Sequence, residues 1–123
     1  MSHIAFLSLI HELDVSPSAI VDLEEGQLSV QKGEGSDIWM FSMKVADMEE
    51  EDRELLSCFF SSGLFQFSDR DVLLKWDPET QSLYAIQKVQ LTWKHYLVFR
   101  SHLNNFLKIV SEYRNYLSIE SLL

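Results

Sequence analysis

The densest group of ionisable side chains is the run DMEEEDRE at residues 47–54, with six carboxylates and one arginine. Neighbouring helical residues point in different directions, so these carboxylates do not converge on one metal ion. Asp47 as N-cap with Glu50 three residues later is typical of a capping box, and the run lies at the positive end of the helix dipole. We interpret it as the solvated start of a helix, with steering of a basic partner as the alternative.

Four histidines and one cysteine are the other candidates for chemistry, and their spacing favours structural roles. The histidines are His3, His11, His95 and His102. They contain no HExxH motif and no pair at i, i+4, the arrangements that bring two ligands to one metal. His95 and His102 are two helical turns apart, too far for one ion. Cys58 has no second cysteine for a disulfide, and nothing near it in the sequence indicates an activated thiolate. We therefore expect no metal site.

Motifs for nucleotide binding or nucleophilic catalysis are absent from the sequence. The four glycines form no phosphate-binding loop, and there is no Walker motif or GxSxG elbow. We expect neither enzymatic activity nor a cofactor. Because catalytic groups are defined by geometry rather than spacing, an enzyme or small-ligand binder with a pocket between sheet and helix stays open, with His95 and Asp71 as scattered candidates.

Length and charge narrow the class of protein further. A chain of 123 residues fits one domain, residues 1–123, with one core. Its net charge of −9 disfavours binding to nucleic acid and to anionic membranes. The N-terminal stretch MSHIAFLSLIHELD lacks a basic region and is too short to span a bilayer. We expect a cytoplasmic protein without membrane insertion.

Two stretches with apolar residues at spacings of three and four predict the helices that position any site. The first begins at Ser2 as N-cap and runs to about Leu13. Its apolar face comprises Phe6, Leu9, Ile10 and Leu13. The last helix begins at Thr92 and runs to about Tyr116. Its apolar stripe comprises Tyr96, Phe99, Leu103, Phe106, Val110, Tyr113 and Leu117.

Between these helices, alternating residues predict strands at 19–24, 26–32 and 37–45. A middle helix follows from Asp47 to about residue 62, before Gly63. Val72 to Leu91 then reads as a hairpin, because Pro78 suits a turn and Asp77 can accept a hydrogen bond from the backbone two residues on. The order α-β-β-β-α-β-β-α predicts an α+β fold, an antiparallel twisted sheet packed by helices.

The apolar side chains exceed what one side of such a sheet needs. The strand at 37–45 directs Trp39, Phe41, Met43 and Val45 to the core. A second, half-apolar face is left for the chain's own helices or for an extended peptide. It begins with Ile38 and Met40, and Leu28 and Val30 on the preceding strand are open to the same two kinds of cover. The middle helix carries an apolar stripe that packs internally or meets a second copy across a two-fold axis. It comprises Leu55, Leu56, Phe59 and Phe60.

Residues 73–89, LLKWDPETQSLYAIQKV, resemble the hairpin of class I type III secretion chaperones (the Tir chaperone-like family), with its Asp-Pro-Glu-Thr-type turn. Small size, acidity and element order match the same family, over nearly the whole chain. The resemblance implies a bacterial cytoplasmic chaperone without catalysis or ATP. It would hold the N-terminal segment of a secreted effector or gatekeeper protein soluble, extended and ready for export, as a homodimer or as a heterodimer with a related small chaperone.

Two sets of residues follow as site predictions from the apolar faces and this resemblance. Client contact is assigned to Phe6, Ile10, Leu28, Val30, Ile38 and Met40. Dimerisation is assigned to Leu55, Phe59, Leu74 and Trp76. An unrelated adaptor that binds a folded partner is the further alternative.

Overall fold

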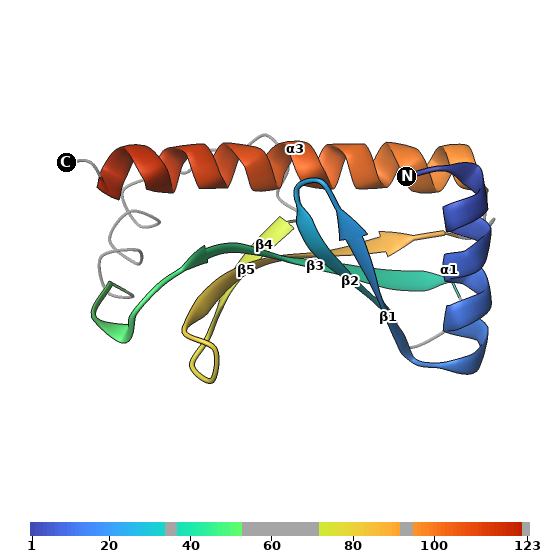
Figure 1. Ribbon diagram of the computed structural model, residues 1–123, viewed down its shortest axis with the longest axis horizontal. Coiled ribbons are helices and arrows are strands. Elements are labelled where there is room, and N and C mark those ends of the chain that lie inside the picture. Colours follow the sequence, from blue (N-terminus) through green and yellow to red (C-terminus); the bar gives the residue numbers. More distant parts are fainter. Residues whose placement is uncertain (34–36, 53–71, 92–94, 122–123) are drawn as a thin grey trace.

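The computed structural model describes residues 1–33, 37–52, 72–91 and 95–121. A five-stranded antiparallel sheet in the order β1-β2-β3-β5-β4 lies against the long helix α3, and α1 stands at one end of the sheet near the first turns of α3 (Figure 1). Residues 50–52 are helical, and the rest of the predicted middle helix lies outside the described residues. The predicted α+β fold is confirmed.

Helix α1 (His3–Val15) begins where the sequence predicts, because the Ser2 hydroxyl accepts a hydrogen bond from the Ala5 amide at 3.1 Å. Its buried residues are Phe6, Leu9 and Leu13. The rest of its broad apolar arc faces outward, since Ile4 and Leu7 are 81% and 55% exposed. The helix therefore buries a narrow stripe and leaves apolar surface on its other side.

The first three strands form two successive hairpin pairings. Strands β1 (Ser18–Leu23), β2 (Gly26–Lys32) and β3 (Ile38–Asp47) pair antiparallel in chain order. The predicted inward face of β3 is confirmed, because Trp39, Phe41, Met43 and Val45 are all buried.

The second hairpin joins β4 (Val72–Asp77) to β5 (Ser82–Gln90). Asp77 Oδ1 accepts the Glu79 amide at 3.0 Å, and Asp77 Oδ2 accepts the Thr80 hydroxyl at 3.2 Å. These two bonds close the turn in the manner expected of aspartate at its first position. Because β5 also pairs with β3, the hairpin is inserted into the sheet with β4 at its edge.

Strand β3 continues four residues past its last pair with β2. The last β2–β3 pair is Leu28 with Met43, whereas pairing with β5 runs on to Asp47 through a bulge between Lys44 and Ala46. The predicted role of Asp47 as a helix N-cap is therefore wrong. Its carboxylate instead accepts the buried Ser82 hydroxyl at 3.3 Å, which extends the β3–β5 ladder past the expected end at Val45.

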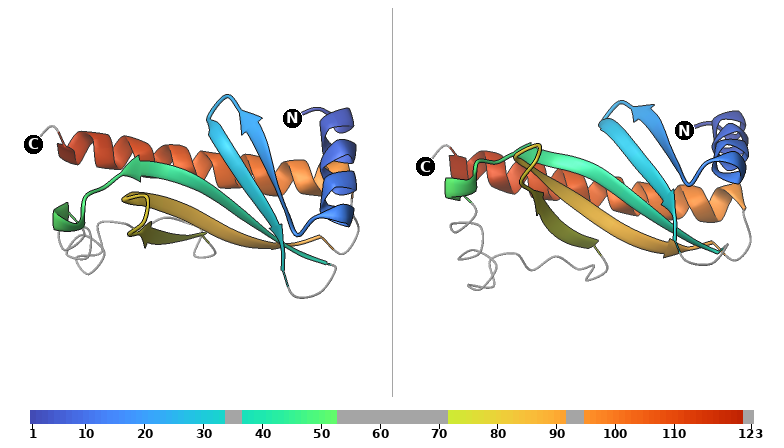
Figure 2. Two further views of the ribbon diagram at one scale, coloured as in Figure 1. Left: turned by 60° about the horizontal axis from the view of Figure 1, so that its bottom comes forward. Right: turned by 90° about the horizontal axis from the view of Figure 1, so that it is seen from below.

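Helix α3 (Tyr96–Ser121) covers one face of the sheet along its length (Figure 2). Its predicted stripe is confirmed, and it also buries Ile109. The helix extends beyond the expected end at Tyr116, and the predicted cap Thr92 lies outside the described residues. Phe99 occupies the centre of the core, with ring centroids 4.7 Å from Phe6 and 5.7 Å from Phe41. Such aromatic pairs contribute about 0.5–1.5 kcal/mol each beyond their buried area.

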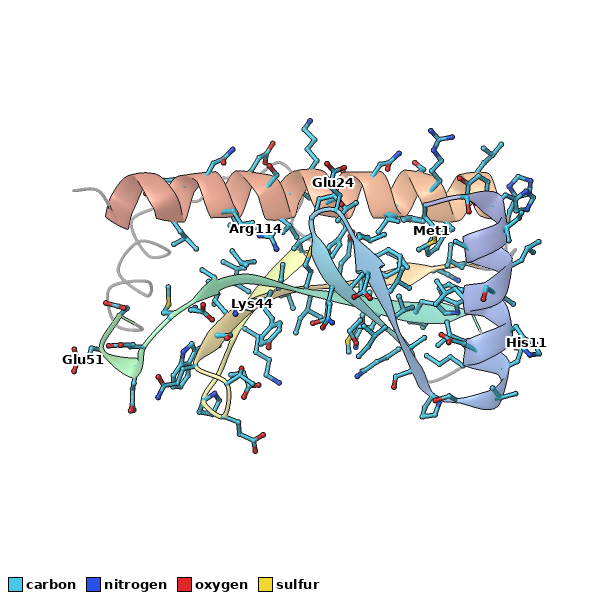
Figure 3. The ribbon with its side chains drawn as sticks, viewed as in Figure 1. Met1, His11, Glu24, Lys44, Glu51 and Arg114 are labelled. Carbon is cyan, nitrogen blue, oxygen red and sulfur yellow. The ribbon has the colours of Figure 1, made fainter. Side chains whose placement is uncertain are left out.

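Arg114 fastens the second half of α3 to the sheet. Its guanidinium donates to the carbonyl oxygens of Glu25 and Lys44, each at 2.6 Å. Glu25 lies in the β1–β2 turn, and Lys44 begins the part of β3 that extends beyond β2. Figure 3 shows the side chain reaching from α3 toward Lys44. One residue thus connects three elements by charge-assisted hydrogen bonds.

Replacing Arg114 by methionine removes both bonds while keeping the aliphatic stem. We expect the free energy of unfolding to fall by about 1.5–3 kcal/mol, the usual range for hydrogen bonds to charged groups, as measured by urea denaturation. The matched control is Lys108→Met, at an exposed position of the same helix. Equal stability of the two variants would show that the Arg114 bonds contribute nothing.

Candidate interaction surface

The two faces of the sheet differ in what covers them. Cross-strand pairs share a face, so Leu28 lies with Met43, and Met43 lies with Ala85. This inner face is buried under α1 and α3. The side chains at the alternate positions point away from α3 and, apart from the buried Ser82 beside the β4–β5 turn, are half-buried or exposed in the described part of the chain. We call this second side the open face.

The open face is a grid of residues fixed by strand register. One row across the strands is Ile20, Ser29, Ser42, Ile86 and Leu73, from β1 to β4. The neighbouring rows place Lys44, Tyr84 and Lys75 on one side, and Gln31, Met40 and Lys88 on the other. Ile20 and Leu73 are 65% and 66% exposed. This surface therefore combines exposed aliphatic groups with lysines on an acidic chain.

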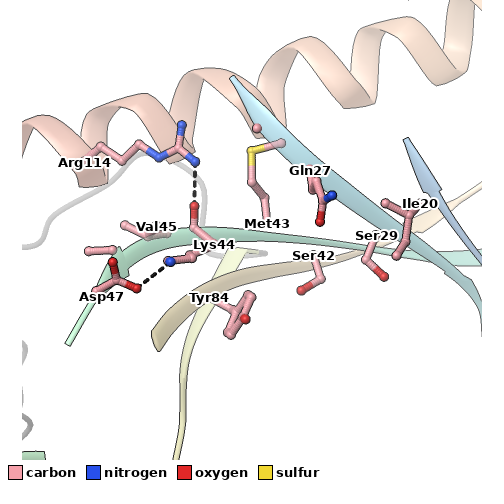
Figure 4. Close-up of a pocket in the computed structure, with 12 residues that line it drawn as sticks. Ile20, Gln27, Ser29, Ser42, Met43, Lys44, Val45, Asp47, Tyr84 and Arg114 are labelled. Atoms are coloured by element: carbon pink, nitrogen blue, oxygen red, sulfur yellow. Dashed lines mark hydrogen bonds and ion pairs between the residues drawn. The ribbon is translucent and has the colours of Figure 1, made fainter. Parts of the chain in front are cut away.

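Two hollows lie on this side of the molecule. The first has a volume of about 530 Å³ and lies between the start of β2 and the last residues of β3, beside Arg114. The second, of about 570 Å³, lies between the sheet and the β4–β5 turn. Ser29, Ser42 and Tyr84 line both hollows. Figure 4 shows these three side chains on the side of the sheet away from α3, with Met43 pointing toward the helix.

One ion pair shapes the electrostatics of the first hollow. The Lys44 ammonium donates to the Asp47 carboxylate three residues on (Figure 4). This hydrogen bond, together with the positive charge of Lys44, lowers the pKa of Asp47 below its ordinary value. Asp47 is thus held as an anion by its neighbour, and Arg114, which reaches in from α3, is a second cation lining this hollow.

The predicted client residues fall on both sides of the sheet, so grouping Leu28 and Val30 with Ile38 and Met40 is wrong. Leu28 and Val30 are 0% exposed, because they pair with Met43 and Phe41 on the inner face. Phe6 is likewise buried, against Phe99. None of these three is accessible on the folded chain.

The remaining predicted client residues lie where a ligand can reach them. Ile38 is 36% exposed and Met40 is half-buried, both on β3 at the open face. Ile10 is half-buried on α1. Ile20, Leu73 and Ile86 also lie on the open face and were not predicted as contact residues. The period-two alternation of their strands was the signal that would have found them.

Of the predicted dimer residues, Leu55 and Phe59 lie outside the described residues, as do Cys58 and Asp71. Leu74 and Trp76 share the inner face with Val72, as expected from alternation, but they are only half-buried. The Trp76 indole donates to the Met48 carbonyl oxygen at 2.8 Å. That bond holds the edge strand β4 against the segment that follows β3.

The described residues show no arrangement suited to metal chemistry. Within ranges 1–33, 37–52, 72–91 and 95–121, no three His, Cys, Asp or Glu side chains lie close enough to hold an ion. His95 has a structural contact, since its Nδ1 accepts the Leu97 amide at 3.2 Å at the start of α3. His3 stacks on Tyr96 at 4.8 Å. In the same part of the chain, no helix combines the length and hydrophobicity that a membrane crossing requires.

No protein-family model matches this chain, and no curated protein sequence matches it. Among solved structures, a chain in the crystal structure of the ExsC–ExsE complex is similar, with a TM-score of 0.58. The two chains are 13% identical, and the match covers 80% of this chain and 74% of that one. At this identity the similarity shows a shared fold, and this fold is the α+β arrangement that the sequence predicted.

The Asp47–Lys44 pair predicts a small pH-dependent contribution to stability. The pKa of Asp47 is lower in the folded than in the unfolded chain, so the pair stabilises the fold above about pH 4 and loses this effect as the pH falls through the folded value. Asp47→Asn should therefore destabilise the protein at pH 7 and lose less stability on acidification, as measured by urea denaturation at each pH. Asp22→Asn, at an exposed strand position, is the control. Parallel pH curves for all three proteins would contradict the pairing.

Proposed function

We propose that this protein is a bacterial cytoplasmic chaperone that binds the N-terminal segment of a type III secreted protein. It keeps that segment extended, soluble and competent for export, without ATP. The observation that carries the proposal is the open face, where Ile20, Leu73 and other aliphatic groups stay exposed on a small acidic domain. A monomeric domain rarely leaves such a surface uncovered unless another molecule covers it.

The fold supports this assignment. The ExsC–ExsE crystal structure is a complex of two proteins, and one of its chains has this fold. We carry over to the present chain the idea that such a fold holds a second polypeptide. The hairpin resemblance at residues 73–89 adds the class of that polypeptide, a secreted protein.

The distribution of apolar surface suits an extended client better than a compact one. Besides the open face, Ile4 and Val15 on α1 are 81% and 78% exposed, and Leu97 at the start of α3 is 61% exposed. These groups lie at one end of the molecule, away from the β4–β5 turn (Figure 1). An extended chain loses conformational entropy on binding, and many modest contacts over a long path offset that loss. Such binding needs no nucleotide hydrolysis.

The proposal includes a dimer. Strand β4 is an edge of the sheet, and Leu74 and Trp76 on it are half-buried in one chain. A second subunit placed against β4 would complete their burial and remove an exposed strand edge. An isologous contact between identical chains is the simplest arrangement.

The purified protein should therefore sediment at about twice the 14.4 kDa of one chain at micromolar concentration. Sedimentation equilibrium measures this directly. A monomer that pairs only when co-expressed with a related small chaperone would identify a subunit of a heterodimeric chaperone, such as one for a gatekeeper protein. A monomer under both conditions would contradict the dimer.

Co-expression with the products of neighbouring genes tests the function itself. A secreted protein should co-purify through its N-terminal segment, because this segment supplies the extended chain that covers the open face. Limited proteolysis should cleave that segment rapidly in the free client and slowly in the complex. Ile86→Asp, on the open face, should abolish co-purification, whereas Lys108→Asp on α3 should not. Capture of a compact domain, with no protected N-terminal segment, would instead identify an adaptor.

A further inference from the structure

Helices α1 and α3 meet at their first turns (Figure 1). His3, the first residue of α1, stacks on Tyr96, the first residue of α3, with ring centroids 4.8 Å apart and an angle of 11° between the rings. The Tyr96 hydroxyl donates to the Met1 carbonyl oxygen at 2.6 Å, and the centroid of its ring lies 5.7 Å from that of Phe6. Tyr96 is therefore the residue through which the start of α3 holds the start of α1.

His95 is the N-cap of α3 and directly precedes Tyr96 in the chain. Its carbonyl oxygen accepts the Phe99 amide at 3.0 Å, and its Nδ1 accepts the Leu97 amide at 3.2 Å. The second of these bonds satisfies an amide that the helix itself leaves without a partner. A neutral imidazole has one nitrogen that donates and one that accepts, so this cap requires the tautomer with its hydrogen on Nε2.

Protonation of His95 removes this cap. Both ring nitrogens of an imidazolium are donors, so Nδ1 can no longer accept the Leu97 amide. The added charge also lies at the positive end of the α3 dipole. Both effects act against the first turn of the helix. Serine, threonine and asparagine, which are more usual N-caps, have no such sensitivity, because their side-chain oxygens do not titrate in this range.

Positive groups surround the cap on the two helices. Neither α1 nor α3 has a carboxylate in its first turn. Arg100 lies on the next turn of α3 and lines a small hollow together with Tyr96 and Met1, whose amino group is a further cation. His3 adds a second titratable ring from α1. Lys94 precedes the cap in the sequence, outside the described residues. A proton on the cap therefore meets no carboxylate in the first turn of either helix.

The sheet brings one carboxylate toward the junction. The Asp37 carbonyl oxygen accepts the Leu91 amide at 2.7 Å, which places the start of β3 beside the segment that leads to His95. Asp37 and His95 are both exposed, and attraction between exposed charges is weakened by water and salt. Asp37 also takes part in another interaction. Its charge therefore moderates the effect of a proton on His95 and does not replace the lost hydrogen bond.

We propose that His95 is a pH-sensitive cap that stabilises the junction of α1 and α3 while its ring is neutral and weakens this junction when the ring is protonated. The stabilisation is present at about pH 8 and is lost toward about pH 5, across the range in which histidine ordinarily titrates. Because Tyr96 follows the cap, fraying of the first turn of α3 also loosens the His3 stack and the bond to Met1. The device belongs to the folded chain alone and needs no client.

Replacing the cap by a residue that does not titrate tests the proposal. Asparagine accepts the same amide hydrogen, so His95→Asn should keep the cap at every pH. In urea denaturation, the folding equilibrium constant of the wild type, relative to that of His95→Asn, should fall about fivefold between pH 8 and pH 5, the usual worth of an N-cap. His95→Ala should be about fivefold less stable than the wild type at pH 8 and equal to it at pH 5. Parallel pH curves for the wild type and His95→Asn would overturn the proposal.

Two further variants isolate the cap from the other histidines. His102→Asn changes a histidine of α3 away from either end, and its pH curve should run parallel to that of the wild type. His3→Gln removes the second ring of the junction, whose protonation has mixed effects, since the Tyr96 ring attracts the charge and the α1 dipole repels it. The pH-dependent difference between His95 and asparagine should persist in the His3→Gln background. Its disappearance there would assign the effect to His3 and overturn the proposal.

Nuclear magnetic resonance reads the cap and the junction directly. At pH 8 the imidazole nitrogens of His95 should show the Nε2–H tautomer, and an Nδ1–H tautomer would rule out the cap. Between pH 8 and pH 5, the hydrogen-exchange protection factors of the Phe99 and Phe6 amides should fall together, by about fivefold, in the wild type and not in His95→Asn. Loss of protection at Phe99 without any loss at Phe6 would overturn the coupling of the cap to α1.

Discussion

Packing of the α3 stripe on the inner faces of β3 and β5 is the contact on which the rest of the molecule depends. Phe99 and Phe106 of the helix lie against Phe41 of the strand, each with ring centroids 5.7 Å apart. Phe6 joins the same cluster from α1. These side chains are all 0–1% exposed, so most of the core is one aromatic layer held between a single long helix and the sheet. Removing any of these rings would leave a large cavity.

This one-sided packing explains why the open face stays available. A sheet has two faces, and in the described part of the chain α1 and α3 are committed to the inner one. The same alternation that places Phe41 and Met43 under α3 turns Met40 and Ser42 outward. The burial of one face of the sheet and the exposure of the other therefore both follow from the alternation of side chains along each strand. The interaction surface needs no separate element to build it.

Local patterns were sufficient to predict much of this arrangement. Alternation identified the inner face of β3, the Ser2 cap located the start of α1, and the Asp77 turn placed the β4–β5 hairpin. The assignment of Leu28 and Val30 to the client surface failed because two neighbouring strands alternate with independent phase. The register, which pairs Leu28 with Met43, shows that they face α3. The alternation of Leu28 and Val30 with polar neighbours within β2 was the available signal that they face the core.

Other details depended on contacts between residues distant in the sequence. Asp47 has the sequence neighbours of a helix cap, yet the β3–β5 ladder carries it into a strand and joins it to Ser82. Arg114 lies 70 residues from Lys44 and 89 from Glu25, so nothing local indicates their bonds. Ser29 and Ser42 likewise lie side by side on the open face only because their two strands pair in this register.

The unequal lengths of β2 and β3 have a consequence for self-association. In the described residues, Lys44 to Asp47 pair with β5 alone. The other edge of this short segment is therefore available to a strand of another molecule. Three features obstruct such pairing: the bulge distorts the backbone, Lys44 places a charge there, and Arg114 already occupies the Lys44 carbonyl oxygen. An unprotected strand edge is a template for stacking into fibrils, and these three features protect this one against it.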